Sequence, residues 1–160
     1  MTAVLRVLMT IALSLALTPA SAQRATPTDI ELRTAYCIPV LQQAVQDSAL
    51  LAQAYPDGQW KDWSAEAAAG LNDKLKRLQA YLEPKIGTFD QPTLTVAAER
   101  GKLDVDVAAQ AQLSCFKQCE SSKPAQGLDD RYTKCLSSCQ AANPVVARTR
   151  ACHRLDWLPF

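Results

Sequence analysis

Six cysteines are the residues of this chain with the clearest capacity for chemistry, because thiols form disulfides, bind zinc or exchange electrons. Four of them form two pairs with the same three-residue gap, Cys115 with Cys119 and Cys135 with Cys139. Residues four apart lie on one face of a helix, so each pair presents two sulfurs to whatever packs beside it. The pattern therefore predicts two helices that face each other.

The order of the pairs predicts how they connect. Bridges from Cys119 to Cys135 and from Cys115 to Cys139 have the same midpoint in the sequence, Gly127, as an antiparallel helical hairpin requires. The crossed pairing would need parallel helices, and a bridge within one pair is disfavoured because its Cβ vectors run side by side. Proline and glycine between the pairs supply turn chemistry. We expect a stapled antiparallel hairpin.

The two remaining cysteines, Cys37 and Cys152, are assigned to a third bridge by elimination. A tetrathiolate zinc site at the four paired cysteines is the less favoured alternative, since structural zinc sites more often use shorter spacings. Exported cysteines also tend to oxidise before they meet a metal. A redox role is disfavoured as well, because the chain contains no CxxC motif. We expect three structural disulfides and no metal.

Residues 110 to 143 resemble the twin CX3C helical hairpin of small mitochondrial intermembrane-space chaperones and of plant α-hairpinin peptides. The first resemblance implies that the protein escorts apolar segments. The second implies antimicrobial or protease-inhibitor activity. Both resemblances concern this supersecondary unit only.

Other polar residues form no recognised catalytic pattern. His153, the only histidine, follows Cys152 directly, and neighbouring residues on a helix point about 100° apart, which disfavours a nucleophile pair. Two acidic pairs are interpreted as helix-start charges, although a hydrolase that uses two of these carboxylates stays open. Three tail arginines could hold an anion, but a solvated basic face is favoured. These acids and bases are Asp104, Asp106, Asp129 and Asp130, and Arg148, Arg150 and Arg154.

Trp60 and Trp63 are the candidate binding residues. They lie three apart beside a predicted turn, where an exposed pair would form a platform for a sugar, a peptide or a membrane surface. Packing of both over the end of a helix bundle is the favoured alternative, because tryptophan is heavily buried on average. Exposure of both indoles would favour binding.

The N-terminus has the parts of a secretory signal peptide, with Arg6, an apolar run over 7–17 and a small-residue cleavage site ending at Ala22. That run is too short for a membrane span, which needs about 20 apolar residues. No second run of that length follows, so we expect no membrane span in the mature chain. We therefore expect a signal peptide over 1–22, one all-helical domain over 23–160, and a periplasmic or secreted protein.

The net charge and the absence of known motifs narrow the range of possible functions. Removing the leader takes away Arg6 and no acid, which leaves 16 basic residues against the 16 acidic ones and makes nucleic acid an unfavourable partner. Signatures of zinc proteases, serine hydrolases, P-loops, EF-hands and covalent haem are absent. No cofactor is therefore predicted.

Helical periodicity and stop signals divide the mature chain. Thr28 and Glu31 form a capping box for a first helix that continues to the turn at residues 55–58, with a kink or short break near Pro39. Ser64 is the expected N-cap of a second, amphipathic helix. Proline and glycine end that helix at residues 84–87.

The second half of the chain follows the same logic. Asp90, just before a proline, starts a further pattern, and residues 91–120 form either one helix or two that meet near Gly101. Asn143 and Pro144 end the hairpin and open a short last helix, after which the aromatic tail docks on the bundle. The fold class is all-α, a bundle of four to five helices with a disulfide-stapled antiparallel hairpin near the C-terminus.

We therefore expect an exported, disulfide-stabilised helical protein that binds another protein, as an inhibitor or an accessory subunit. The leader, the six cysteines and the lack of catalytic residues support this expectation. A periplasmic metal-handling protein or small enzyme is the first alternative, and a structural envelope component is the second.

Overall fold

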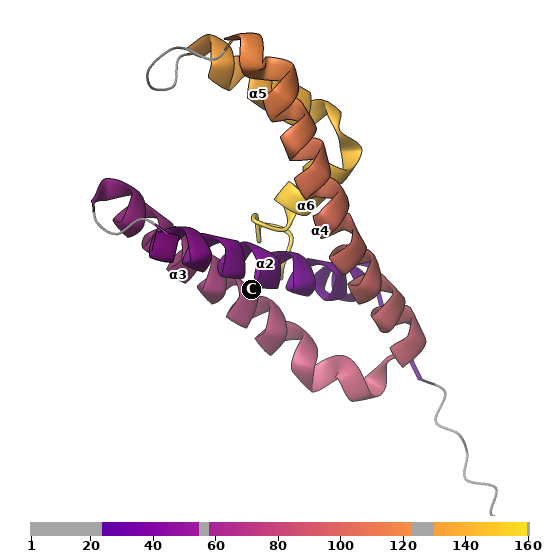
Figure 1. Cartoon of the computed structure of the whole chain (residues 1–160). Coiled ribbons are helices and arrows are strands. Elements are labelled where there is room, and N and C mark those ends of the chain that lie inside the picture. Colours follow the sequence, from indigo (N-terminus) through magenta and orange to yellow (C-terminus); the bar gives the residue numbers. More distant parts are fainter. Residues whose placement is uncertain (1–23, 55–57, 123–129, 160) are drawn as a thin grey trace, which may run out of the picture.

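The computed structural model describes residues 24–54, 58–122 and 130–159, and every structural statement below concerns these residues. Within them the chain forms five α-helices and no strand, which confirms the predicted all-α fold (Figure 1). The helices are α2 (Asp29–Ala54), α3 (Gln59–Leu82), α4 (Gln91–Cys119), α5 (Asp130–Ala142) and α6 (Pro144–Ala151), with two short 3₁₀ segments, η1 (Glu83–Thr88) and η2 (Glu120–Ser122).

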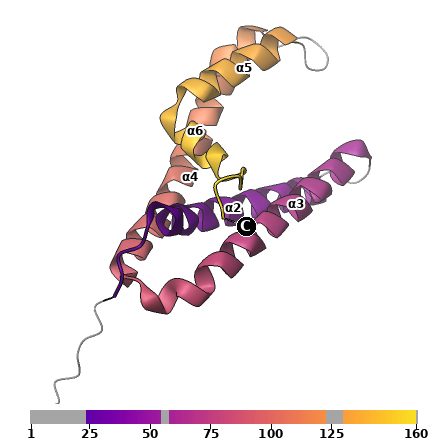
Figure 2. The ribbon, with the colours of Figure 1, turned by 180° about the vertical axis from the view of Figure 1, so that it is seen from behind.

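Two helical hairpins are joined at a crossing. Helices α2 and α3 run antiparallel along each other, and α4 crosses α2 near its N-terminal half (Figure 1). Helix α5 returns along the C-terminal half of α4. The short α6 packs on α4 and leads the C-terminal tail back to the first hairpin (Figure 2). The free ends of the two hairpins therefore lie apart from each other.

Local sequence signals place most helix starts correctly. The Thr28 amide donates to the Glu31 carboxylate at 3.1 Å, which is the backward bond of the predicted capping box. Asp90 caps α4 by accepting from the Thr93 amide at 3.2 Å. Asn143 caps α6 and accepts from the amides of the second and third residues after it at 3.0 and 3.2 Å.

Three local interpretations are corrected or decided. The predicted break near Pro39 is wrong, because α2 runs through this proline as one helix. Ser64 is not an N-cap: α3 begins five residues earlier, after Gly58, whose φ of 98° turns the chain into the helix. Residues 91–119 form one helix, with Gly101 inside it. The predicted turns at residues 55–57 and around Gly127 fall outside the described residues.

The close crossing of α2 and α4 brings Pro39 and Gly101 together and requires a glycine at position 101. A Cβ atom at Gly101 would lie 2.2 Å from the Tyr36 carbonyl oxygen and 3.0 Å from Cγ of Pro39. Only a residue without a side chain allows the two backbones to approach this closely. The proline in α2 and the glycine in α4 are therefore packing partners, and neither one ends a helix.

A buried carboxylate locks the same crossing. Asp104 of α4 is almost fully buried and accepts a hydrogen bond from the Tyr36 hydroxyl at 2.9 Å. Arg100, one turn earlier on α4, and Arg148 of α6 reach its two oxygens at 2.9 and 3.1 Å. Burial and this carboxylate raise the pKa of Tyr36 well above its usual range. Asp104 thus ties three helices together.

The apolar core lies in the first hairpin and reaches the tail. Its larger cluster joins α2 and α3 to Leu158, and its smaller one adds the start of α4 through Leu94. The predicted docking of the aromatic tail is confirmed by Trp157, which packs against the larger cluster and carries the Arg33 guanidinium over its ring at 4.4 Å. Neither cluster contains a residue of α5.

Disulfides join α4 to α5 and reinforce the apolar core. The structure contains the same three pairs that the sequence favours: Cys115–Cys139 and Cys119–Cys135 join α4 to α5, and Cys37–Cys152 ties α2 to the start of the tail. Both cysteines of the last bridge are buried members of the larger core cluster. The second hairpin is therefore stapled covalently, whereas the first is held by apolar packing.

Candidate functional site

The two candidate tryptophans lie at the free end of the α2–α3 hairpin. Trp60 and Trp63 stand in the first turns of α3, each 59% exposed, with ring centroids 6.1 Å apart in an edge-to-face arrangement. The favoured alternative, in which both pack over the bundle end, is therefore wrong. The indoles form an aromatic pair that solvent reaches.

Exposed aliphatic residues accompany the pair. Leu50 and Leu51, in the last turns of α2, lie at the same end of the hairpin and are 61% and 48% exposed. Neither apolar core cluster includes a residue from this end. We call Leu50, Leu51, Trp60 and Trp63 the hairpin-end patch. Because isolated exposed leucines are common, it is their occurrence at the same end of the hairpin as two exposed indoles that makes this end a candidate interaction site.

The charges around the hairpin-end patch are mostly negative. Asp62 and Glu66 flank Trp63 on α3, and Asp47 lies one turn before the leucines on α2; all three are exposed. None of these carboxylates forms an ion pair with another residue of the described chain. Lys61 is the one basic residue in 47–54 and 58–66, and it has an interaction of its own. This end of the molecule therefore combines aromatic faces with carboxylates that form no ion pair within the described ranges, and Asp47 accepts a hydrogen bond from the Gln43 side chain at 2.8 Å.

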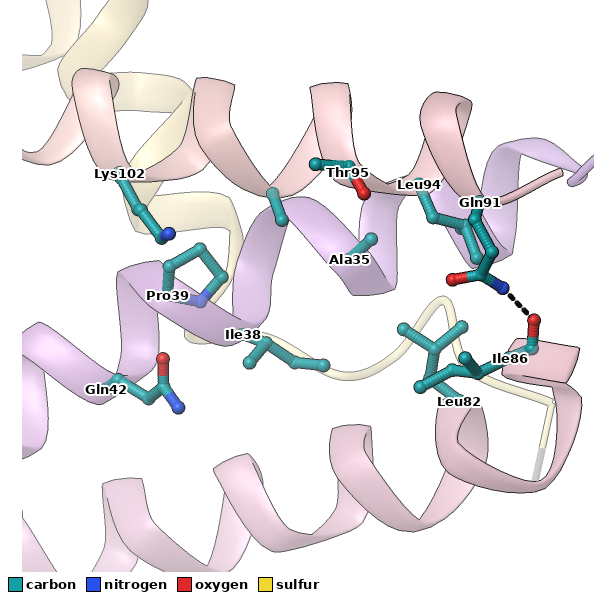
Figure 3. A pocket seen from close by; sticks show the side chains of 11 residues that line it. Ala35, Ile38, Pro39, Gln42, Leu82, Ile86, Gln91, Leu94, Thr95 and Lys102 are labelled. Carbon is teal, nitrogen blue, oxygen red and sulfur yellow. Dashed lines mark hydrogen bonds between the residues drawn. The ribbon is translucent and has the colours of Figure 1, made fainter. Parts of the chain in front are cut away.

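A groove elsewhere on the molecule was not predicted from the sequence. An apolar groove of about 240 Å³ lies between α2, the end of α3 and the start of α4, and Ile38, Leu82 and Leu94 are among the residues that line it (Figure 3). Its wall at η1 is fixed by the Gln91 side-chain amide, which donates to the Ile86 carbonyl. Because these residues come from four separate elements, no single periodicity in the sequence marks the groove.

The basic tail and the histidine do not converge on a catalytic arrangement. Arg148 pairs with the buried Asp104, and Arg150 donates to the Gln140 side chain. His153 is partly buried, and burial together with the nearby charges of Lys74 and Arg150 lowers its pKa. Its neighbour Cys152 is held in a disulfide, so no thiol is available as a nucleophile.

The acidic candidates are separated in space. Asp104 is a structural anchor at the helix crossing, whereas Asp106 is exposed on the same helix and Asp130 opens α5. Asp129 lies outside the described residues. Across the described chain, no group of three His, Cys, Asp or Glu side chains is placed to hold a metal ion. Asp104 is therefore held by structural partners and is not available as a free acid.

One further buried carboxylate stabilises the base of the first hairpin. Glu31 accepts hydrogen bonds from the Tyr81 hydroxyl at 2.8 Å and from the Lys85 ammonium at 3.0 Å, in addition to those from Thr28. Burial alone would raise its pKa, but these hydrogen bonds outweigh burial and lower the pKa to about 2. Since every oxygen contact is to a structural partner, Glu31 is an anchor and not a free acid.

No protein-family model, curated protein or solved structure matches this chain. None of the helices in the described ranges is long and apolar enough to cross a membrane.

Proposed function

We propose that this protein is exported and works by binding another protein, which it contacts through the hairpin-end patch. The leader-like N-terminus and the three disulfides support an oxidising compartment such as the periplasm or the exterior. The observation that carries the proposal is the pair of adjoining indoles, each 59% exposed, at the free end of a hairpin.

Tryptophan at such a place is suited to protein recognition. An indole offers a large apolar face and one N–H donor, and it loses little conformational entropy when a partner fixes it. Tryptophans are also among the residues that dominate binding energy at protein interfaces. Neither Trp60 nor Trp63 belongs to an apolar core cluster. Their exposed indole surface is therefore better explained by contact with a partner than by a contribution to the stability of the fold.

Site-specific photo-crosslinking in the producing cell tests this proposal. A photoreactive residue in place of Leu50, which is 61% exposed, leaves both indoles intact and is compared with the same residue in place of Leu113, which is 60% exposed but lies on α4. We expect a discrete crosslinked protein adduct from position 50 and none from position 113. The absence of any protein adduct at 50, or equal adducts at both positions, would refute binding through this surface.

A further inference from the structure

We infer that the partner segment recognised by the hairpin-end patch is a basic amphipathic helix, with lysine or arginine beside an apolar face. This inference rests on the proposed function and adds the chemistry of the partner. It follows from two properties found together at one end of the molecule, the exposed indoles and the carboxylates around them.

The first property is charge. In residues 47–54 and 58–66 three exposed carboxylates, those of Asp47, Asp62 and Glu66, stand against the single base Lys61. Glu66 lies one turn after Trp63 and therefore on the same side of α3, whereas Asp62 directly precedes Trp63 and points about 100° away from it. A cationic partner would pair with these acids, whereas an acidic partner or an anionic membrane surface would be repelled.

The second property is the aromatic face. An indole attracts a lysine or arginine cation over its ring as well as apolar side chains, so Trp63 suits both faces of a basic amphipathic helix. The leucines at the end of α2 add apolar area at the same end of the hairpin. A helix that lays an apolar stripe on a hydrophobic surface, with flanking bases on acids, is an established mode of peptide recognition.

The other hairpin end shows that this charge is local. Residues 113–122 and 130–138 carry three bases, Lys117, Arg131 and Lys134, against two acids, Glu120 and Asp130. Phe116 and Leu113 are exposed there at 43% and 60%, so apolar exposure is comparable while the sign of the charge is opposite. The free end of the α4–α5 hairpin is therefore a control surface for the effect of charge.

The test measures binding of a labelled amphipathic helical peptide of leucine and lysine to the whole mature protein by fluorescence anisotropy. A leucine–glutamate peptide of the same length and pattern is the peptide control. We expect W63A to weaken binding about tenfold or more, and D62N/E66Q to weaken it about fivefold at low salt and to flatten its salt dependence. The matched variant E120Q/D130N, which removes the same charge at the other end, is expected to bind as wild type.

Several outcomes overturn the inference. Equal binding of the glutamate peptide, or equal loss in E120Q/D130N, would show that the basic character or the location is wrong. Binding to phosphatidylcholine vesicles, with or without phosphatidylglycerol, in preference to the lysine peptide would assign the surface to membranes. Crosslinking at position 50 distinguishes the two proposals. A protein adduct there without affinity for the lysine peptide refutes the partner's chemistry only, whereas failure of both experiments refutes the proposed function.

Discussion

Replacing Asp104 by asparagine removes the charge at the helix crossing and almost nothing else, because the two side chains have nearly the same volume. In the native protein this carboxylate is 1% exposed and contacts Tyr36, Arg100 and Arg148. Asparagine keeps one acceptor oxygen but turns an NH₂ group toward one of these donors. The substitution therefore leaves the crossing with donors that face each other.

The expected loss can be built from the three contacts. The buried bond from the Tyr36 hydroxyl to a charged acceptor is worth about 1.5–3 kcal/mol. Arg100 and Arg148 are 57% and 47% exposed at their side chains, so each ion pair is discounted to about 0.2–1 kcal/mol. We expect D104N to lower the free energy of unfolding by about 3 kcal/mol, which is a loss of roughly 10 °C in melting temperature.

Urea unfolding followed by circular dichroism measures this loss, and D106N is the control. Asp106 lies two residues further along α4 and is exposed, so its substitution should change stability by less than about 0.5 kcal/mol. An ultraviolet titration adds a local readout: the pKa of Tyr36 should fall toward its usual range in D104N, while burial still holds it above that range. Equal stability of D104N and D106N would refute the anchoring role of Asp104.

Three further predictions concern the scaffold. G101A should lower the free energy of unfolding by about 2–3 kcal/mol, because its Cβ would meet the Tyr36 carbonyl oxygen at 2.2 Å. G70A, whose Cβ would have nothing within 4 Å, should stabilise α3 by up to about 1 kcal/mol. Urea midpoints that shift alike in both variants would contradict this reasoning. Glu31 has a folded pKa of about 2, below its unfolded value of 4.5, so its ionised form stabilises the fold by about 3 kcal/mol at neutral pH, and this stabilisation is lost as the pH falls from 5 to 2. The free energy of unfolding of E31Q should therefore lack this part of the pH dependence. A pH profile of E31Q identical to that of the wild type would contradict the role of Glu31. The bridge from Cys37 to Cys152 spans 115 residues of sequence. Serine at both positions should lower the free energy of unfolding, measured in urea, by about 4–5 kcal/mol. A loss below about 1 kcal/mol would show that core packing alone holds the tail.

Features that depend on neighbouring residues could be predicted from the sequence. The cap at Asp90, the cap at Asn143 and the backward bond of the capping box all join residues two or three apart. The stapled hairpin was predictable for the same reason, since spacing four apart fixes the face on which both sulfurs of a pair lie. In these cases the local chemistry is the whole cause of the structure.

Features that depend on distant partners could not be predicted in this way. Asp104 was interpreted as a helix-start charge, yet its role is set by Tyr36, 68 residues earlier in the chain. Pro39 was expected to kink or break its helix; the helix is not broken there, and the packing of Pro39 close to Gly101 of α4 is a contact between residues 62 apart that local sequence does not reveal. Trp60 and Trp63 were expected to be covered, because average burial says nothing about whether a hairpin end has a neighbour.

The groups that stabilise the fold lie away from the proposed binding surface. The buried anchors Glu31 and Asp104 lie near the helix crossing and the base of the first hairpin, and the disulfides lie in the second hairpin and at the tail. None of them reaches the hairpin-end patch. W63A should therefore change the free energy of unfolding by less than about 1 kcal/mol while it weakens binding of the lysine peptide about tenfold or more. D104N should show the converse, a large loss of stability with native affinity at temperatures where it is folded. If W63A unfolded the protein instead, the indole would be a structural residue, and the reasoning that assigns this end of the hairpin to a partner would fail.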